Sequence, residues 1–414
     1  MKRLKILSSI LLLSFLTSVS YPQERVKVLT HNILNYPNFS SEKNAKFQLI
    51  LNEAKPDIVA VQEILSQYGV NLFLSDVLGS SFSAATFFDG PDTDNALYYK
   101  DSLLTLLTAE IIPNTPRYIT KYVLQHNFTQ DIFIIYVAHL KAGDTQSEEL
   151  TREQEAARLR IYTDQLSAGT NYIVVGDFNL YRSTEPAYVR LLDQTNSGYF
   201  LDPVNRPGNW HASTQFADIH TQSTRVAQLP DGGSTGGLDD RFDFILVSQS
   251  LMNPGGVDYV EGTYWAYGND GQHFNQQLVN PPYPISEQIA FALHDVSDHL
   301  PVVAEFDFGV VNDVESTINP SLLAFNLSQN YPNPFNPSTR ISFTIPATVS
   351  GRNQIVNLSV YDVLGREVTR IINEEKAPGI YDVEFNAGDL TSGVYIYRLT
   401  TQEYSSSKKL TIIK

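Results

Sequence analysis

Short apolar runs rich in β-branched residues recur along the first three quarters of the chain, and most of them stop at a polar residue or a glycine. The first occupies residues 26–33 and predicts a strand. An amphipathic pattern begins at Ser40 and closes before Pro56, which predicts a helix. A second buried strand is predicted at residues 57–61. Strand, helix and strand in this order predict the start of a layered α/β domain.

The pattern that follows favours an antiparallel arrangement. Four strand-like runs follow one another with short connections, at residues 96–99, 103–112, 117–126 and 131–138, which is typical of a meander. A charged pattern over residues 147–166 predicts a helix whose polar face includes Arg152, Arg158 and Arg160. The next strand is predicted at residues 171–176.

Long loops are predicted on both sides of a further strand at residues 240–247. Residues 201–237 are rich in Gly, Pro, Asn, Asp, Ser and Thr, as in loops that carry substrate contacts. A second loop-rich stretch precedes an apolar strand at residues 300–308. Weak periodicity then predicts a linker, and alternating strands separated by glycine turns predict a small all-β module.

The N-terminal segment predicts a secretory signal peptide. Lys2, Arg3 and Lys5 precede an uncharged apolar run, which is too short to cross a bilayer. No later segment is apolar enough to do so, which predicts a mature chain without a transmembrane segment. The predicted division is a leader at residues 1–20, a first domain at 21–309, a linker at 310–328 and a second domain at 329–414.

The composition of the chain limits the kinds of catalytic and metal-binding residues that it can use. The 414-residue chain has 42% hydrophobic and 18% charged residues, as expected of a globular protein. It contains no cysteine, which excludes thiol nucleophiles and leaves oxygen ligands and histidine for metal chemistry. The net charge is −16, and most of the acidic excess lies in residues 21–310. The negative electrostatic potential of such a domain repels a polyanion. It counts against tight binding of a nucleic acid unless a local basic patch or divalent cations offset it.

Polar side chains follow the predicted strands of the first domain. They are Asn32, Gln62 with Glu63, His139, Asp177 with Asn179, and Asp298 with His299, together with Asp243 inside the strand at 240–247. One such residue alone is usually a turn or cap residue, or a structural histidine. The ensemble of carboxylates, amides and histidines suits metal-assisted attack of water on phosphorus.

Three of these residues have natural roles in such chemistry. Glu63 is the expected ligand for Mg²⁺ or Mn²⁺, since these cations prefer carboxylate oxygen. His299 is the candidate general base, and Asp243 is the carboxylate that could orient it and raise its basicity. His139 is expected to donate a hydrogen bond to a phosphoryl oxygen or to protonate the leaving group.

These motifs, in this order over residues 26–308, resemble the endonuclease/exonuclease/phosphatase superfamily, whose members include DNase I-like nucleases, sphingomyelinases and inositol phosphatases. The resemblance implies an α/β fold, a four-layered sandwich of two packed mixed β-sheets flanked by helices. It also implies a divalent cation, Mg²⁺ or else Mn²⁺ or Ca²⁺.

The resemblance further implies roles for individual residues. Metal binding falls to Glu63, Asp298 and Asn32, positioning of metal and phosphate to Asp177 and Asn179, activation of water to the Asp243–His299 pair, and substrate contacts to His139, Asn179 and Arg241. His139 matches the branch of the superfamily that contains secreted nucleases and sphingomyelinases.

The C-terminal segment resembles the sorting domain of the type IX secretion system of Bacteroidetes-like bacteria. The resemblance rests on Asn-Tyr-Pro-Asn-Pro-Phe-Asn-Pro at residues 330–337, Tyr-Asp-Val-Leu-Gly-Arg at 361–366, Gly-Val-Tyr at 393–395 and Lys-Lys-Leu at 408–410. It implies the type IX machinery as a partner and export through the outer membrane, followed by release or surface attachment. A carbohydrate-binding or adhesive β-sandwich is the alternative.

Together these observations predict an exported, divalent-metal-dependent phosphodiesterase, most simply an extracellular nuclease. A phosphatase or a sphingomyelinase-like lipid phosphodiesterase is the alternative among enzymes. A non-catalytic binding or adhesion protein on the same fold is the alternative of another class.

Overall fold

The structure is a computed structural model. It describes residues 24–253, 255–310, 326–327, 330, 332–345, 354–376, 379–388, 390–401 and 404–413. The predicted leader and most of the predicted linker lie outside these residues. The chain forms two compact units, residues 1–311 and 312–414, and each is described by itself.

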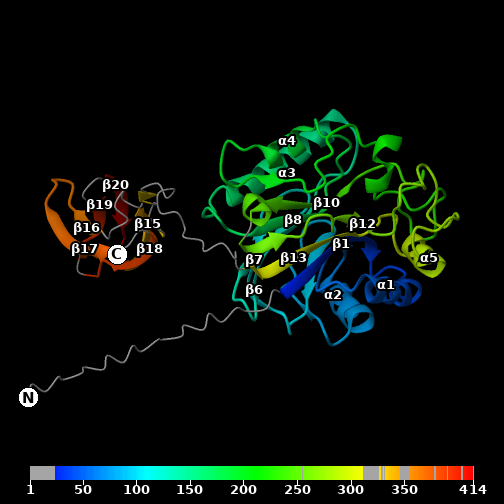
Figure 1. Ribbon diagram of the computed structural model, residues 1–414, viewed down its shortest axis with the longest axis horizontal. Helices are drawn as coiled ribbons and strands as arrows, with labels where there is room; N and C mark the ends of the chain where they lie inside the picture. The colour runs from blue at the N-terminus through cyan, green and yellow to red at the C-terminus, as the bar shows by residue number, and fades with distance from the viewer. Residues whose placement is uncertain are drawn as a thin grey trace, which may run out of the picture. The chain divides into compact units, whose positions relative to one another are not determined.

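The first unit is built on two mixed β-sheets (Figure 1). One sheet contains β1 (Glu24–Tyr36), β2 (Ile58–Ile64), β3 (Ser83–Ala84), β4 (Asp94–Tyr99), β11 (Gly256–Tyr259), β12 (Trp265–Ala266) and β13 (Val302–Val310). The other contains β5 (Leu104–Ile112), β6 (Ile119–His126), β7 (Ile132–His139), β8 (Tyr172–Asp177), β9 (Phe200–Leu201) and β10 (Asp243–Ser248). β1 pairs in parallel with β2 and β7 with β8, whereas β13 and β10 are antiparallel to their neighbours.

Alternation along the strands places apolar side chains on both faces of each sheet. Val28 of β1 and Val137 of β7 belong to the core between the sheets. Leu29 packs with α1 (Ser40–Ala54), α2 (Gln67–Phe73) and α5 (Glu287–Val296), and Tyr136 packs with α3 (Gln146–Thr163) and α4 (Pro186–Leu192). Strands buried on both faces are expected to be continuous apolar runs. The predicted four-layered α/β sandwich is therefore confirmed.

The predicted meander is only partly correct. β5, β6 and β7 are successive antiparallel neighbours, but β4 pairs with β2 in the other sheet. The run at residues 96–99 carries no feature that indicates which sheet it joins. Helices α2, α4 and α5 were not predicted from the sequence.

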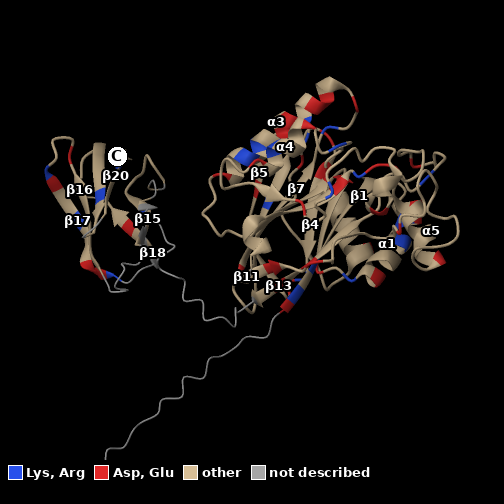
Figure 2. Ribbon diagram, turned by 45° about the horizontal axis from the view of Figure 1, so that its top comes forward, with Lys and Arg blue, Asp and Glu red and all other residues tan. Residues whose placement is uncertain are grey.

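Two arginines of α3 differ from the prediction as well. The helix carries acidic and basic residues along its length (Figure 2), yet Arg152 and Arg160 are buried. The Arg152 guanidinium donates to Glu185 at 2.7 Å. Arg160 donates to Asp164 at 3.0 Å and to the carbonyl oxygen of Arg190 at 2.6 Å. Their placement on a polar face was therefore wrong, because partners inside the fold satisfy both guanidinium groups.

The second unit is all β. Its described strands are β14 (Asn326–Leu327), β15 (Ser338–Ile345), β16 (Gln354–Tyr361), β17 (Glu367–Lys376), β18 (Gly379–Asn386), β19 (Gly393–Thr400) and β20 (Ser405–Ile412). They form a three-stranded and a four-stranded antiparallel sheet around one apolar core, as predicted. Within the described parts of both units, no helix combines the length and apolar character needed to cross a bilayer.

Candidate active site

The strand-end residues of the first unit meet at one edge of the two sheets. Asn32 on β1 lies beside Gln62 on the parallel strand β2. His139 on β7 lies beside Asp177 on the parallel strand β8. β10 is antiparallel to β8 and begins at the same edge, where Asp243 lies opposite Asp177. Parallel neighbours end on the same side of a sheet, which explains why residues distant in sequence converge.

Asn32 links the two sheets. Its Nδ2 donates to Oε1 of Glu63 at 3.0 Å and to Oδ2 of Asp177 at 3.1 Å. Its own Oδ1 accepts from the backbone N–H of Leu34 at 3.1 Å, and the second oxygen of Glu63 accepts from the N–H of Asn35 at 3.2 Å. The structure therefore places Asn32 as the group that orients two carboxylates, with its own oxygen already engaged.

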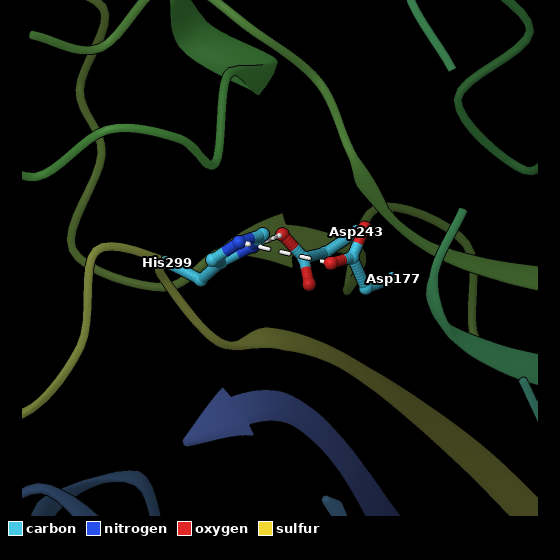
Figure 3. Close-up of side chains that lie close together, drawn as sticks. All are labelled: Asp177, Asp243 and His299. Atoms are coloured by element: carbon cyan, nitrogen blue, oxygen red, sulfur yellow. Dashed lines mark hydrogen bonds and ion pairs between the residues drawn. The ribbon is translucent and has the colours of Figure 1, made fainter. Parts of the chain in front are cut away.

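His299 contacts two aspartates (Figure 3). Its Nδ1 lies 2.8 Å from Oδ2 of Asp243, and its Nε2 lies 3.7 Å from Oδ2 of Asp177. All three side chains are buried. The backbone of this segment is fixed by Oγ of Ser297, which donates to the carbonyl oxygen of Asn32 at 2.6 Å.

The electrostatics of this group favour added positive charge. Burial opposes the imidazolium form of His299, but the carboxylates of Asp243, Asp177 and Asp298 outweigh it and raise its pKa well above the ordinary value. Burial also raises the pKa of Asp177 to about 7, although the charge of His299 opposes this shift. Both groups therefore hold protons more tightly than isolated side chains. A bound cation can neutralise the negative charge of the same carboxylates.

His139 approaches the same oxygen of Asp177 as His299 does. Its Nε2 lies 3.4 Å from Oδ2 of Asp177. Burial, followed by the positive charges of Arg117 and His299, lowers the pKa of His139 well below its usual value. His139 is therefore a neutral imidazole at neutral pH. Its Nδ1 is buried and has no hydrogen-bond partner in the part of the chain that the structure describes.

Asn179 is held by its own loop and by the segment that follows β7. Its backbone N–H donates to Oδ1 of Asp177 at 3.1 Å, and its Nδ2 donates to the carbonyl oxygen of Leu140 at 3.2 Å. A φ of 51° at Asn179 is a left-handed conformation that asparagine tolerates better than most residues. The side-chain amide carries a second N–H besides the one that donates to Leu140, so Asn179 can still donate to a ligand, and its amide oxygen can accept.

The long loop at residues 201–237 adds a residue that was not predicted from the sequence. Nε2 of Gln222 lies 2.6 Å from Nε2 of His299 and donates to Oδ2 of Asp298 at 3.3 Å. The N–H of Ser234 donates to the same oxygen of Asp298 at 2.6 Å. A glutamine in an irregular loop carries no sequence signal that links it to His299.

The cavity between these residues fits a hard divalent cation. It has a volume of about 360 Å³, and its walls include Glu63, Asp177, Asp298, His139, Asn179 and His299. Oδ1 of Asp298 is buried and, within the described residues, has no hydrogen-bond partner. A buried carboxylate oxygen is costly to leave unpaired. Three carboxylates around one cavity form the oxygen-rich donor set that Mg²⁺, Mn²⁺ or Ca²⁺ prefers.

The structure does not bring Arg241 to this cavity. Its guanidinium is fully buried and donates to both oxygens of Asp202 at 2.7 and 2.9 Å. It also lies 4.2 Å from the ring centroid of Phe244 and 5.2 Å from that of Trp210. These contacts keep Arg241 out of the cavity. They connect the start of β10 to the loop at residues 201–237 and so stabilise both.

Replacing Arg241 by alanine is therefore expected to destabilise the first unit by about 3–5 kcal/mol, because Asp202 is left buried without its partner. Tryptophan fluorescence during urea unfolding measures this loss, since both tryptophans, Trp210 and Trp265, lie in the first unit. Arg206→Ala is the matched control, because its ion pair with Asp218 is partly exposed, unlike the fully buried pair of Arg241 with Asp202. A raised KM with unchanged stability would instead indicate a substrate contact.

Two family models match the chain. Residues 29–299 match the Endonuclease/Exonuclease/phosphatase family, and residues 329–414 match the Secretion system C-terminal sorting domain. Among curated proteins, no relative matches the chain.

Solved structures similar to this chain include three whose identity, coverage and TM-score are as follows. D. rerio TDP2 complexed with single strand DNA product is 17% identical, with 68% of this chain and 98% of that chain covered and a TM-score of 0.45. An endonuclease/exonuclease/phosphatase family protein from Bacteroides thetaiotaomicron is 16% identical, with 70% and 99% covered and a TM-score of 0.44. A mannosyl-6-phosphatase from the same species is 15% identical, with 68% and 99% covered and a TM-score of 0.41. Similarity at this level does not indicate a substrate.

The match to the family model covers more than half of the chain. The chain therefore belongs to the endonuclease/exonuclease/phosphatase family, and it carries a C-terminal secretion sorting domain.

Proposed function

We propose that the first unit is a divalent-metal-dependent phosphoesterase. The observation that carries this proposal is the buried hydrogen bond of 2.8 Å between His299 and Asp243, beside a cavity lined by three carboxylates. In the reaction, the oxygen of water forms a bond to phosphorus and the bond from phosphorus to the ester oxygen breaks. The departing oxygen takes up a proton and leaves as an alcohol.

His299 moves the proton of the attacking water in this proposal. Its Nδ1 is engaged by Asp243, so Nε2 is the nitrogen that faces the cavity. Asp243 fixes the orientation of the ring and stabilises the imidazolium that forms. Against burial, the carboxylates of Asp243, Asp177 and Asp298 raise the pKa of His299, and a cation held by Asp177 and Asp298 would offset part of their charge.

Three side chains are suited to the charge that develops on the phosphoryl group. Arg117, His139 and Asn179 all line the cavity. Arg117 brings a permanent positive charge to the wall of the cavity, where it is also paired with the partly exposed Asp92 at 3.0 Å. The neutral His139 can donate a hydrogen bond or supply a proton to the departing oxygen. Donors that are already positioned stabilise a transition state without further reorganisation.

Glu63, Asp177 and Asp298 are the residues that would hold the cation. When bound, Mg²⁺ or Mn²⁺ neutralises phosphoryl oxygens and orients the substrate. Asn32 contributes through its hydrogen bonds to Glu63 and Asp177. Such contacts fix ligands in a geometry that suits the ion.

The completeness of the site supports an enzyme over an adhesion protein. Each position at which the chemistry requires a carboxylate, an amide or a histidine holds such a residue. This proposal covers the nuclease predicted from the sequence as well as its alternatives, a phosphatase and a lipid phosphodiesterase. The C-terminal sorting domain points to export and a secreted or surface location. We further propose that residues 1–20 are the leader and that the type IX machinery is the export partner.

Replacing Asp243 by asparagine tests this function. The variant is expected to lower kcat for bis(p-nitrophenyl) phosphate by about 10²- to 10⁴-fold, because the ring of His299 loses the carboxylate that orients it. Rates are measured on the full chain with Mg²⁺ or Mn²⁺ and again with excess EDTA, which is expected to abolish turnover. Asp218→Asn is the control, since Asp218 is exposed and lies outside the cavity. Hydrolysis that survives EDTA, or equal rates in both variants, would contradict the proposal.

A further inference from the structure

A second cavity adjoins the candidate active site. We call it the distal cavity. Its volume is about 550 Å³, and it shares Tyr181, Gln222, Ser234 and Phe242 with the first cavity. Gln222 marks the boundary, because its amide also contacts Nε2 of His299 at 2.6 Å. A group esterified to a phosphate at His299 therefore lies within reach of the distal cavity.

Carboxylates and a histidine form one side of the distal cavity. Nδ1 of His211 lies 2.8 Å from Oδ1 of the buried Asp240. Asp239 lies beside them, with one ligand atom of each of the three within 4.8 Å of the others. Burial raises the pKa of Asp239, and it raises the pKa of Asp240 to about 6 although His211 opposes that shift. A ligand that displaces water from such acceptors must donate hydrogen bonds to them.

Apart from Asp144 and Arg182, the remaining walls are neutral and partly aromatic. The rings of Tyr181 and Phe242 meet edge to face with centroids 4.9 Å apart, and Tyr181 meets His211 in the same way at 5.5 Å. Asn209 and Thr235 add neutral hydrogen-bonding groups. His211 is half-exposed and uses Nδ1 for Asp240, so Nε2 is the nitrogen that it presents. Apolar ring surfaces beside polar acceptors suit a molecule with C–H faces and hydroxyl edges.

We propose that the distal cavity binds an uncharged, hydroxyl-rich group, a sugar or polyol, that is esterified to the phosphate hydrolysed in the first cavity. This inference rests on the proposed function. Hydroxyl groups donate to the carboxylates of Asp239 and Asp240 and accept from neutral donors such as Asn209. His211, Asp239 and Asp240 are then the residues that determine specificity for the substrate.

The charges of the distal cavity oppose a polyanion. Asp144, Asp239 and Asp240 line it, and among its described lining residues the only lysine or arginine is Arg182. Arg182 is already paired with Glu149 at 2.6 Å. A further phosphate of a nucleic acid would therefore meet carboxylates without a free cation to offset them. A quaternary ammonium group is less suited than a polyol, because the aromatic rings meet one another edge-on and do not form an open cage.

The test compares substrates that share a phosphate and differ in the attached group. Glucose 6-phosphate, its methyl diester, choline phosphate, methyl phosphate and a DNA dinucleotide are each assayed on the full chain with Mn²⁺. The wild type is expected to show a kcat/KM for one of the glucose esters at least about tenfold above that for choline phosphate and the dinucleotide. The two glucose esters distinguish a monoester substrate from a diester.

Variants assign this preference to the cavity. His211→Ala and Asp240→Asn are each expected to lower kcat/KM for the preferred glucose ester about tenfold more than kcat/KM for methyl phosphate, mainly through KM. Asp218→Asn is the control outside both cavities and is expected to match the wild type. Metal-dependent turnover without a glucose preference, or with equal losses on all substrates, overturns the inference and leaves the proposed function standing.

A binding measurement separates the two proposals if no substrate is turned over. Glucose 6-phosphate is titrated calorimetrically into the wild type and the His211→Ala variant in the presence of Mn²⁺. Binding that is weakened about tenfold in the variant supports the distal cavity even without hydrolysis. Equal binding in both proteins, no binding, or tighter binding of the dinucleotide overturns the inference.

Discussion

Replacing His299 by glutamine is expected to lower kcat for metal-supported phosphoester hydrolysis by about 10²- to 10⁴-fold. Glutamine is polar and of similar length, but its amide accepts no proton at neutral pH. The variant therefore keeps a side chain that can hydrogen-bond to Asp243 while it removes the nitrogen that faces the cavity. Steady-state kinetics with bis(p-nitrophenyl) phosphate at saturating Mn²⁺ measure the change.

His294→Gln is the matched control for this experiment. His294 also contacts an aspartate through Nδ1, at 2.8 Å from Asp295, but it does not line the cavity. Its kcat is expected to stay within about twofold of the wild type. Circular dichroism and tryptophan fluorescence establish that both variants are folded. Equal loss of rate in the two variants would show that His299 acts on the fold and not on the reaction.

The position of the site was predictable because strand ends are visible in the sequence. Apolar runs locate β1, β2, β7 and β8, and each run stops at a polar residue. Glu63, His139 and Asp177 then line the cavity, whereas the buried Asn32 after the β1 run reaches it only through its hydrogen bonds to Glu63 and Asp177. β7 and β8 pair in parallel, and their register places His139 beside Asp177. No local sequence signal for this contact is needed, because the pairing of the two strands determines it. Local pattern and topology therefore determine this part of the site together.

Contacts made by irregular loops were not predictable. Gln222 and His211 lie in the loop at residues 201–237, where no periodicity indicates which side chains turn inward. For Arg241 the sequence predicts a contact with the substrate, but the structure does not place this residue at the cavity. Arg241 stands in a motif next to Asp243, but its partner Asp202 fixes it inside the fold. Burial of a charge depends on a partner that is distant in the sequence, so adjacency to a catalytic residue does not indicate function.

Replacing Glu63 by glutamine is expected to weaken Mn²⁺ binding by on the order of 100-fold, and to lower kcat/KM at limiting metal by a similar factor. Glutamine preserves the size of the side chain and can still accept from the N–H of Asn35, which donates to Glu63 at 3.2 Å. It removes one negative charge from the cavity that would hold the cation. Isothermal titration calorimetry with Mn²⁺ measures the affinity independently of turnover.

The control and the metal dependence decide what a loss of activity in Glu63→Gln means. Glu53→Gln changes an exposed carboxylate on α1 and is expected to bind Mn²⁺ as the wild type does. If Glu63 holds the cation, raising the Mn²⁺ concentration restores part of the activity of Glu63→Gln, because binding is then driven by mass action. Unchanged Mn²⁺ affinity in Glu63→Gln would remove Glu63 from the cation site and leave Asp177 and Asp298 as the carboxylates that define it.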